Sequence, residues 1–249
     1  MSTKYPLVFI HGAGGFDRIF NLTYFYNIED YLQKNDYEVF VPKLTAYDRI
    51  EKRSKQIVDY VDSLGFDKVN LLGHSLGGVD ARYAISQYGL SKKVASLTTI
   101  SSPHYGTSAI DVILGIIPCK VCFLASKAME KIGMDFDVFI QMSKTYMTNE
   151  FNHNVPDSPD VEYFSWSGKA SLTGKNKVKP FLLTFFTIIS LMDGANDGMV
   201  SVDSAKWGNW LGTLEVDHYG MIGQPMGLTN FDYLSFFLKE ANRLEKAGF

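Results

Sequence analysis

The segment Val69–Gly78 constrains this chain most, because an apolar run there leads into the pentapeptide G-H-S-L-G and then into a helical pattern. A G-x-S-x-G sequence between a strand and a helix predicts a sharp turn that holds its serine, here Ser75, above the end of a sheet. Gly73 and Gly77 suit such a turn, since a side chain at either position would collide with neighbouring backbone or force a strained φ. The pentapeptide also occurs in ordinary turns, but the flanking strand and helix patterns favour a nucleophilic serine.

Length and composition are typical of a compact enzyme. With 249 residues, of which 46% are hydrophobic and 20% charged, the chain has enough apolar material for a single α/β domain over residues 1–249. A formal net charge of -3 provides no basic surface, so nucleic acid is not an expected partner. The longest apolar run, Phe181–Met192, is shorter than the roughly 18 residues that a spanning helix needs. We therefore expect no transmembrane segment.

The first ten residues do not look like a secretory signal, because the apolar stretch Leu7–Ile10 is short and poorly flanked. The expected location is the cytoplasm, or outside the cell after export without a cleaved signal peptide.

Strand and helix patterns alternate along most of the chain. Strands are expected at Leu7–Ile10, Tyr37–Val41, Lys68–Leu72, Val94–Ile100, Val161–Trp166 and Gly212–Val216. Helices are expected at Ile28–Asn35, Ile50–Leu64, Leu76–Tyr88 and Asn230–Lys246. This alternation predicts an α/β fold with a mostly parallel central sheet and helices on both faces.

Between residues 107 and 160 the alternation stops, and apolar helical patterns at Ala109–Ile117 and Phe136–Phe151 replace it. We interpret residues 107–160 as a helical cap, or lid, inserted over the carboxyl ends of the strands, where open α/β sheets bind ligands. Its stretch Val112–Ile117 is more apolar than a small soluble substrate requires, which favours transient contact with a lipid surface. The alternative is that this face packs on the core.

A nucleophilic serine needs an imidazole base. Where the serine lies in a G-x-S-x-G turn between a strand and a helix, the order along the chain is serine, then acid, then histidine. His218 follows the strand pattern Thr213–Val216, so a loop at the carboxyl edge of the sheet would carry it toward Ser75. His153 precedes any later strand that could supply an acid before it. His218 is therefore the predicted base.

The acid should come from a loop between the last two strands. Asp197 lies between Asn196 and Gly198, whose turn chemistry lets a short side chain be aimed from a loop. We prefer Asp197 to Asp193 on this ground. Asp217 is adjacent to His218, and adjacent side chains rarely face each other.

Two backbone N–H groups are needed to stabilise the oxyanion that forms during acyl transfer. One is expected from Leu76, directly after the serine, and the other from Ala13 in the glycine-rich loop that follows the first strand. A phosphate-binding loop is the alternative, but neither G-x-G-x-x-G nor G-x-x-x-x-G-K-[ST] is present.

Cys119 and Cys122 form a C-x-x-C motif, but no second ligand pair accompanies it, so it does not predict zinc. We interpret these cysteines as small buried hydrophobic residues, with a redox dithiol as the weaker alternative. No metal and no cofactor are expected.

Several of these motifs occur together in one known family. In this sequence they are Phe9–Gly12 with Gly15–Phe16, Lys68–Ser75, Ser102–Thr107, Tyr163–Gly168, Ala195–Val200, Asp217–His218 and Ala241–Leu244. On these residues the chain resembles α/β-hydrolases, specifically the Pseudomonas-type true bacterial triacylglycerol lipases and their shorter Proteus-like relatives. The resemblance implies a triad of Ser75, Asp197 and His218, oxyanion donors at Ala13 and Leu76, and hydrolysis of long-chain acyl esters at lipid surfaces.

The resemblance further implies structural roles for His11 and His104, and an arginine, Arg53, that braces the oxyanion loop. It also implies a structural calcium ion held by two aspartates, but Lys179 and Gly220 stand at those positions here, and only Gln224 keeps a ligand-like side chain. Our hypothesis is that calcium is absent and that the Lys179 ammonium replaces its charge.

The sequence therefore predicts a serine ester hydrolase, most simply a triacylglycerol lipase acting on lipid or acyl-ester substrates. A soluble carboxylesterase, a thioesterase and a phospholipase are alternatives within the same chemistry. A lipid-binding module without catalysis is an alternative of another class.

Overall fold

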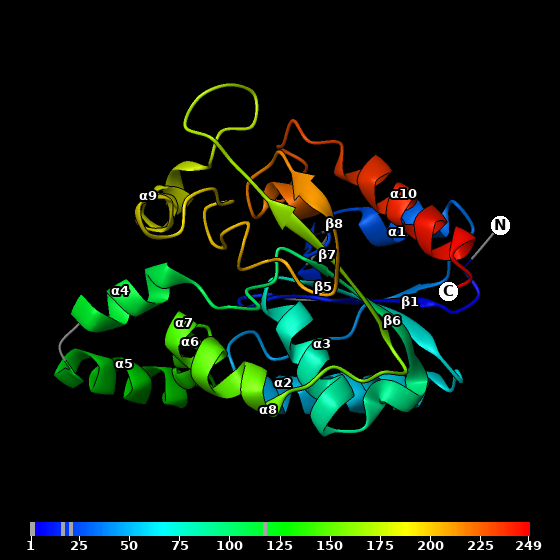
Figure 1. The fold of residues 1–249 in the computed structure, drawn as a ribbon, viewed down its shortest axis with the longest axis horizontal. Helices are drawn as coiled ribbons and strands as arrows, with labels where there is room; N and C mark the ends of the chain where they lie inside the picture. The colour runs from blue at the N-terminus through cyan, green and yellow to red at the C-terminus, as the bar shows by residue number, and fades with distance from the viewer. Residues whose placement is uncertain (1–2, 16–17, 20–21, 117–118) are drawn as a thin grey trace.

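A parallel sheet forms the centre of the computed structural model, which describes residues 3–15, 18–19, 22–116 and 119–249 (Figure 1). Six strands lie in the order β4-β1-β5-β6-β7-β8, and every neighbouring pair is parallel. They are β1 (Leu7–Ile10), β4 (Val39–Phe40), β5 (Val69–His74), β6 (Val94–Ile100), β7 (Glu162–Gly168) and β8 (Asn209–Leu214). The predicted α/β fold is confirmed, and all six strands overlap their predicted ranges.

Four helices cover the two faces of the sheet. They are α1 (Ile28–Gln33), α2 (Ile50–Leu64), α3 (Leu76–Gln87) and α10 (Tyr233–Lys246). Helices α1 and α10 lie on one face and α2 and α3 on the other (Figure 1). A short antiparallel ribbon of β2 (Arg18–Ile19) and β3 (Leu22–Thr23), which the sequence did not suggest, follows β1.

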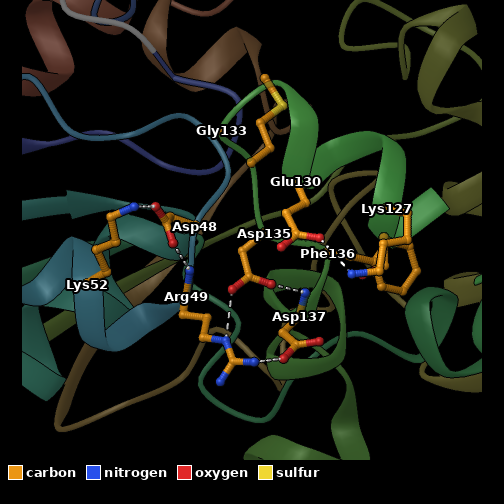
Figure 2. A pocket seen from close by; sticks show the side chains of 11 residues that line it. Asp48, Arg49, Lys52, Lys127, Glu130, Gly133, Asp135, Phe136 and Asp137 are labelled. Atoms are coloured by element: carbon orange, nitrogen blue, oxygen red, sulfur yellow. Dashed lines mark hydrogen bonds and ion pairs between the residues drawn. The ribbon is translucent and has the colours of Figure 1, made fainter. Parts of the chain in front are cut away.

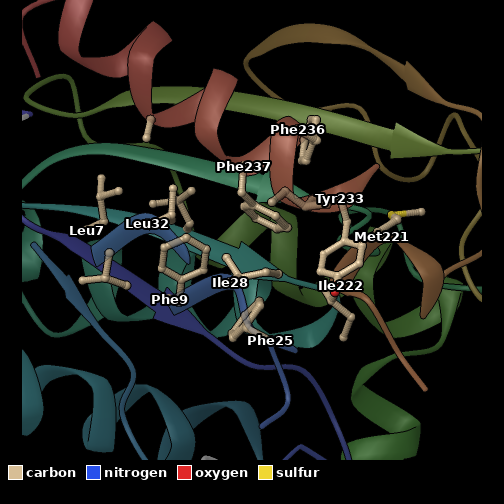
Figure 3. Close-up of a cluster of buried hydrophobic side chains, with 14 of the residues drawn as sticks. Leu7, Phe9, Phe25, Ile28, Leu32, Met221, Ile222, Tyr233, Phe236 and Phe237 are labelled. Atoms are coloured by element: carbon tan, nitrogen blue, oxygen red, sulfur yellow. The ribbon is translucent and has the colours of Figure 1, made fainter. Parts of the chain in front are cut away.

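Strand β1 shows why the sheet needs continuous apolar sequence. Leu7 and Phe9 belong to the cluster that packs under α1 and α10, whereas Val8 and Ile10 belong to the cluster under α2 and α3. Figure 3 shows Phe9 among the side chains of the first cluster, where its ring centroid lies 5.5 Å from that of Phe237 on α10. Because successive side chains point to opposite faces, a strand covered on both sides must be apolar throughout.

The described residues between β6 and β7 form helices joined by loops, with no strand of the central sheet among them. The helices are α4 (Ser108–Ile116), α5 (Cys119–Lys131), α6 (Asp137–Gln141), α7 (Lys144–Tyr146), the π-helical η2 (Met147–Phe151) and α8 (Asn152–Asn154). The expected helix Ala109–Ile117 corresponds to α4, although Ile117 lies outside the described residues. The helical pattern predicted at Phe136–Phe151 is divided among α6, α7 and η2. Ser143 interrupts it, and its Oγ accepts the Tyr146 N–H (3.1 Å), as an N-cap does.

Helix α5 lies within the segment predicted to be a helical cap, although no separate range was predicted for it, and none of its described side chains is buried. Cys122 is only partly buried, so the expectation of a buried residue is wrong for it, and the Cys119 side chain lies outside the described part.

The segment between β6 and β7 is attached to the core by residues that directly follow α5. Figure 2 shows Arg49 at the start of α2 between Asp135 and Asp137, with 2.8 Å between Arg49 Nε and Asp135 Oδ2.

A long connection between β7 and β8 carries η3 (Pro180–Leu182) and the apolar helix α9 (Leu183–Met192). Helix α9 contacts α4, so two apolar helices from distant parts of the sequence lie side by side (Figure 1). Within the described residues no single helix is both long and apolar enough to cross a membrane. Helix α4 taken together with Lys120–Lys131 meets those criteria, but the two parts are bent by 112°.

The tight contact between the start of α3 and β1 predicts very different effects of two Gly→Ala substitutions. A Cβ at Gly77 would lie 2.3 Å from the Ile10 carbonyl oxygen, whereas a Cβ at Gly115 in α4 would meet nothing within 4 Å. We expect Gly77→Ala to lower the free energy of unfolding by about 2 kcal/mol or more, because the neighbour is backbone and cannot move aside. Gly115→Ala should change it little or raise it by about 0.5–1 kcal/mol. Urea denaturation of both variants measures this, and equal stabilities would contradict it.

Candidate active site

The turn after β5 holds Ser75 in a backbone conformation that a residue with a side chain seldom adopts. Ser75 has φ 56° and ψ -131°, and its N–H donates to the Ile100 carbonyl at the end of β6 (3.0 Å). A Cβ at Gly12 would lie 2.8 Å from the Ser75 Cβ, so the loop after β1 packs directly against the serine. Such strain persists only where the surroundings fix the backbone. Here β1, β6 and α3 fix it.

Asp197 and His218 form a buried pair at the carboxyl edge of the same sheet. Asp197 lies between β7 and β8, and His218 lies after β8; they are 0% and 3% exposed. His218 Nδ1 lies 2.7 Å from Asp197 Oδ2, and the His218 N–H donates to the Asp197 carbonyl (2.9 Å). Because the carboxylate oxygen accepts, Nδ1 carries the proton, and Nε2 keeps its lone pair for a substrate or nucleophile proton.

The predicted turn chemistry aims Asp197. Asn196 Oδ1 accepts the Gly198 N–H (2.8 Å), which closes the turn around the aspartate. Asp197 Oδ1 accepts the N–H groups of Met199 (2.9 Å) and Val200 (2.8 Å). Both carboxylate oxygens of Asp197 therefore have a hydrogen-bond partner, which fixes the orientation of the carboxylate.

The competing candidates lie elsewhere. Asp193 pairs with Lys144 Nζ (2.7 Å), and Asp217 pairs with Lys179. His153 is exposed, and its Nδ1 contacts the Thr148 carbonyl (3.1 Å). The side chains of all three are thus engaged with groups other than Asp197 and His218.

His74, directly before the serine, connects the nucleophile turn to the histidine loop. Its Nε2 lies 3.1 Å from the His218 carbonyl oxygen, and its Nδ1 lies 2.7 Å from the Tyr24 hydroxyl. Since a carbonyl only accepts, His74 Nε2–H donates to it, and Tyr24 donates to Nδ1. Burial, together with the nearby His218, holds the pKa of His74 well below its usual value, so this ring stays neutral.

The rings around His218 limit access to it. The His74 ring centroid lies 4.6 Å from that of His218, and the Tyr219 ring meets His218 edge-on at 5.5 Å. Burial raises the pKa of Tyr219, and the nearby Tyr47 and Asp197 raise it further. Neutral rings thus surround the base and leave Asp197 as its charged partner.

The two predicted oxyanion donors belong to segments next to the serine. Ala13 lies in the turn after β1, and Leu76 is the first residue of α3, where a helix leaves its N–H without an intrahelical partner. Arg53 braces the Ala13 loop: its Nη2 donates to the His11 carbonyl (2.6 Å), and its Nε lies 2.8 Å from Asp80 Oδ2. Burial raises the pKa of Asp80 to about 6, against the lowering effect of Arg53.

The remaining buried histidines have packing roles. His11 Nε2 accepts the Leu44 N–H (3.2 Å), and its Nδ1 contacts the Gly12 carbonyl (3.0 Å). His104 contacts Thr99 Oγ1 (2.9 Å), and burial, followed by the nearby Arg82, holds its pKa well below the usual value. These contacts agree with the structural roles that the resemblance implied.

A cavity of about 260 Å³ opens beside the Ala13 loop. Four of its eight lining residues are aromatic, and the lining consists of Ala13, Gly14, Tyr24, Tyr47, Phe181, Tyr219, Gln224 and Pro225. Apolar walls next to an oxyanion loop are suited to an acyl chain.

The positions at which related lipases hold calcium do not fit a calcium ion here. Lys179 Nζ lies 2.8 Å from both oxygens of Asp217, and Asp217 Oδ1 also accepts the Gly220 N–H (2.8 Å). The amide group of Gln224 donates to the Thr23 carbonyl (2.6 Å). Calcium requires six to eight oxygen ligands, whereas this site offers one carboxylate that an ammonium already neutralises. Within the described residues, no cluster of three or more His, Cys, Asp or Glu side chains is suited to a metal.

Sequence reasoning missed several residues that shape this site. His74 occupies the variable position of G-x-S-x-G, Tyr24 lies in an irregular loop, and Ser101 follows β6 with a hydroxyl that donates to Asp197 Oδ2. No spacing rule identifies such contacts, because each joins residues that are distant in sequence.

Comparison with known sequences gives the class of the protein. A family profile described as alpha/beta hydrolase fold matches residues 5–118. A triacylglycerol lipase of Vibrio cholerae is 28% identical over 284 residues, covering 99% of this chain and 89% of that protein. One from Pseudomonas fragi is 27% identical over 293 residues, covering 100% of this chain and 98% of that protein.

Solved structures share the fold. A mature lipase of Bacillus licheniformis has a TM-score of 0.74 at 20% identity, covering 96% of this chain and 93% of that chain. A metagenomic carboxyl esterase has a TM-score of 0.79 at 16% identity, covering 99% of this chain and 77% of that chain. The protein thus has the α/β-hydrolase fold, and its full-length relatives identify it as an ester hydrolase. Its sequence is related to the bacterial triacylglycerol lipases, which confirms the resemblance expected from its motifs.

The Lys179–Asp217 pair predicts stability that does not depend on calcium. Lys179 and Asp217 are 16% and 3% exposed, so Lys179→Met would leave a nearly buried carboxylate without its cation. We expect it to lower the free energy of unfolding by about 2–3 kcal/mol. The matched control is Lys169→Met: Lys169 pairs with Glu215, and the two side chains are 44% and 64% exposed. That exposed pair should be worth about 0–1 kcal/mol.

EGTA should leave the melting temperature and activity of the unmodified protein unchanged. Thermal denaturation with EGTA, and again after calcium is restored, checks this. A melting temperature that falls with EGTA and recovers with calcium would show that a metal does stabilise the histidine loop.

Proposed function

We propose that this protein is a triacylglycerol lipase that hydrolyses acyl esters through an acyl-enzyme on Ser75. His218 is the proposed base, and Asp197 is the carboxylate that orients and stabilises it. The observation that carries the proposal is the Asp197–His218 hydrogen bond of 2.7 Å in the loops after β7 and β8, beside a strained serine at the head of α3. Relatives named triacylglycerol lipase support the lipid substrate class.

In the proposed mechanism His218 acts first as a base and then as an acid in each half-reaction. Ser75 Oγ attacks the ester carbonyl carbon while His218 Nε2 takes the hydroxyl proton, and Asp197 stabilises the resulting imidazolium. The tetrahedral intermediate collapses, and His218 returns the proton to the departing alcohol. Water then attacks the acyl-serine, His218 again takes and returns a proton, and the carboxylic acid leaves.

The N–H groups of Ala13 and Leu76 are the proposed oxyanion donors. Both are backbone groups held by packing: Leu76 by the start of α3, and Ala13 by the loop that Arg53 braces. Donors fixed before the reaction stabilise the developing negative charge without further reorganisation.

The test of the nucleophile is Ser75→Ala. We expect it to reduce hydrolysis of a chromogenic acyl ester by at least about a thousandfold, since only binding and oxyanion stabilisation remain. Ser86→Ala, at the other end of α3, is the matched control and should retain wild-type activity. Comparable activity of Ser75→Ala and wild type would refute the proposal. A folded wild-type protein that never reacts with a fluorophosphonate would point to a lipid-binding module instead.

The cavity beside Ala13 leads us to expect substrates with acyl chains longer than butyryl. A soluble substrate series of increasing chain length discriminates the proposed lipase from the alternatives. Activity confined to acetyl and butyryl esters would indicate a carboxylesterase.

We further propose that residues 107–160 act as a cap whose moving part is α5. Arg49 anchors the root of this segment through Asp135 and Asp137 (Figure 2). Gln141 anchors it too, since its side chain accepts the Ile50 N–H (2.8 Å), whereas the described side chains of α5 are not buried. Segments with little burial open at the lowest free energy. Contact with a lipid surface would cover the apolar residues that such opening exposes.

Two exposed apolar side chains of the cap make this testable. Ile116 and Phe123 are 75% and 61% exposed, and each is worth about 1.5–3 kcal/mol when a lipid surface covers it. With emulsified triacylglycerol, wild-type activity should rise once the substrate exceeds its solubility limit. Ile116→Asp with Phe123→Asp should weaken that rise far more than hydrolysis of a soluble ester. Tyr88→Asp, at the end of α3 away from Ser75, is the control.

Two results together would contradict the cap proposal. They are wild-type activity that saturates smoothly through the solubility limit, and a double variant that loses activity equally on the emulsified and the soluble substrate.

A further inference from the structure

Ser101, the first residue after β6, donates its hydroxyl hydrogen to Asp197 Oδ2. Asp197 Oδ2 is also the atom that faces His218 Nδ1 at 2.7 Å. The serine and the histidine therefore share one carboxylate oxygen, while Met199 and Val200 hold the other through their N–H groups. Ser101 is fully buried, so no bulk water replaces its hydroxyl.

The backbone of Ser101 is arranged for this contact. Its φ of 49° lies in the left-handed region, which a residue with a side chain occupies only when its surroundings fix it. The Ser101 N–H donates to the Trp166 carbonyl on β7 (2.8 Å). The preceding residue, Ile100, accepts the N–H of Ser75 (3.0 Å). The end of β6 thus ties the nucleophile with one residue and the acid with the next.

We propose that Ser101 is a positioning residue for ester hydrolysis: its hydroxyl fixes Asp197 Oδ2 and shares the charge that this oxygen presents to His218. The inference rests on the proposed roles of Ser75, Asp197 and His218. Ser101 touches neither substrate nor the reacting atoms, and it acts only through the carboxylate.

A shared acceptor has a chemical consequence. A hydrogen bond from Ser101 stabilises the carboxylate and lowers the negative charge on Asp197 Oδ2, which weakens its attraction for the Nδ1 proton of His218. Without it, Oδ2 attracts that proton more strongly, so His218 stays protonated to higher pH. The carboxylate also loses one of the donors that hold its orientation.

Other groups around the pair are accounted for and do not provide this effect. On β5, His74 is neutral and faces the His218 ring, and Tyr24 reaches it through His74. On the histidine loop, Tyr219 lies edge-on to His218, and the charge of Asp217 is balanced by Lys179 beside η3.

The experiment compares pH profiles of kcat/KM on a soluble ester, normalised to active sites titrated with a fluorophosphonate. We expect Ser101→Ala to move the midpoint of the acidic limb upward by roughly half a pH unit and to lower kcat by about three- to tenfold, with little change in KM. Ser101→Gly should do the same, and because glycine suits a φ of 49°, it separates loss of the hydroxyl from backbone strain.

The matched control is Ser102→Ala. Ser102 is the adjacent buried serine, and its hydroxyl has no hydrogen-bond partner among the described residues. It should leave the midpoint where it is in wild type. In an Asp197→Asn background, Ser101→Ala should cause no further loss, because its route of action is already gone.

Three results overturn the inference: an unmoved midpoint in both Ser101 variants, a shift in only one of them, or an equal shift in Ser102→Ala. Failure of the proposed function would give a different result, since Ser75→Ala and Asp197→Asn would then retain the activity of wild type.

Discussion

The backbone conformation of Ser75 is the constraint on which the rest of the site depends. A residue with φ 56° and ψ -131° stays in place only because β1, β6 and α3 approach it closely. The approach is so close that a Cβ added at Gly77 would lie 2.3 Å from the Ile10 carbonyl oxygen. The same closeness brings the Ala13 loop beside the serine and puts the first N–H of α3 next to it. The strain at Ser75 and the closeness of the two proposed oxyanion donors thus have one physical cause.

Electrostatic order around the histidine comes from burial rather than from many charges. His74 and Tyr24 are neutral because desolvation disfavours their charged forms, so the low-dielectric space near His218 contains one principal charge, that of Asp197. Charges farther out are paired: Lys179 with Asp217 and Arg53 with Asp80. An imidazolium that forms during reaction is therefore stabilised by one nearby carboxylate of fixed orientation.

The segment between β6 and β7 differs from the core in how it is held. Polar contacts of Arg49 and Gln141 fasten its base to the start of α2, while α5 exposes apolar side chains such as Phe123 and Leu124. Apolar surface that the fold does not cover is unfavourable in water and favourable against lipid. An ester hydrolase with this arrangement has a physical reason to respond to the state of its substrate.

The sequence by itself determined the sheet strands and the helices that cover them, because strong apolar periodicity and the elbow motif are local signals. It also predicted Ser75, Asp197 and His218, whose order and turn chemistry are readable along the chain. The tertiary structure added the contacts of His74 and Ser101 with the histidine loop and Asp197. Each of these joins groups far apart in sequence, and the hydrogen bonds and burial exist only once the chain is packed.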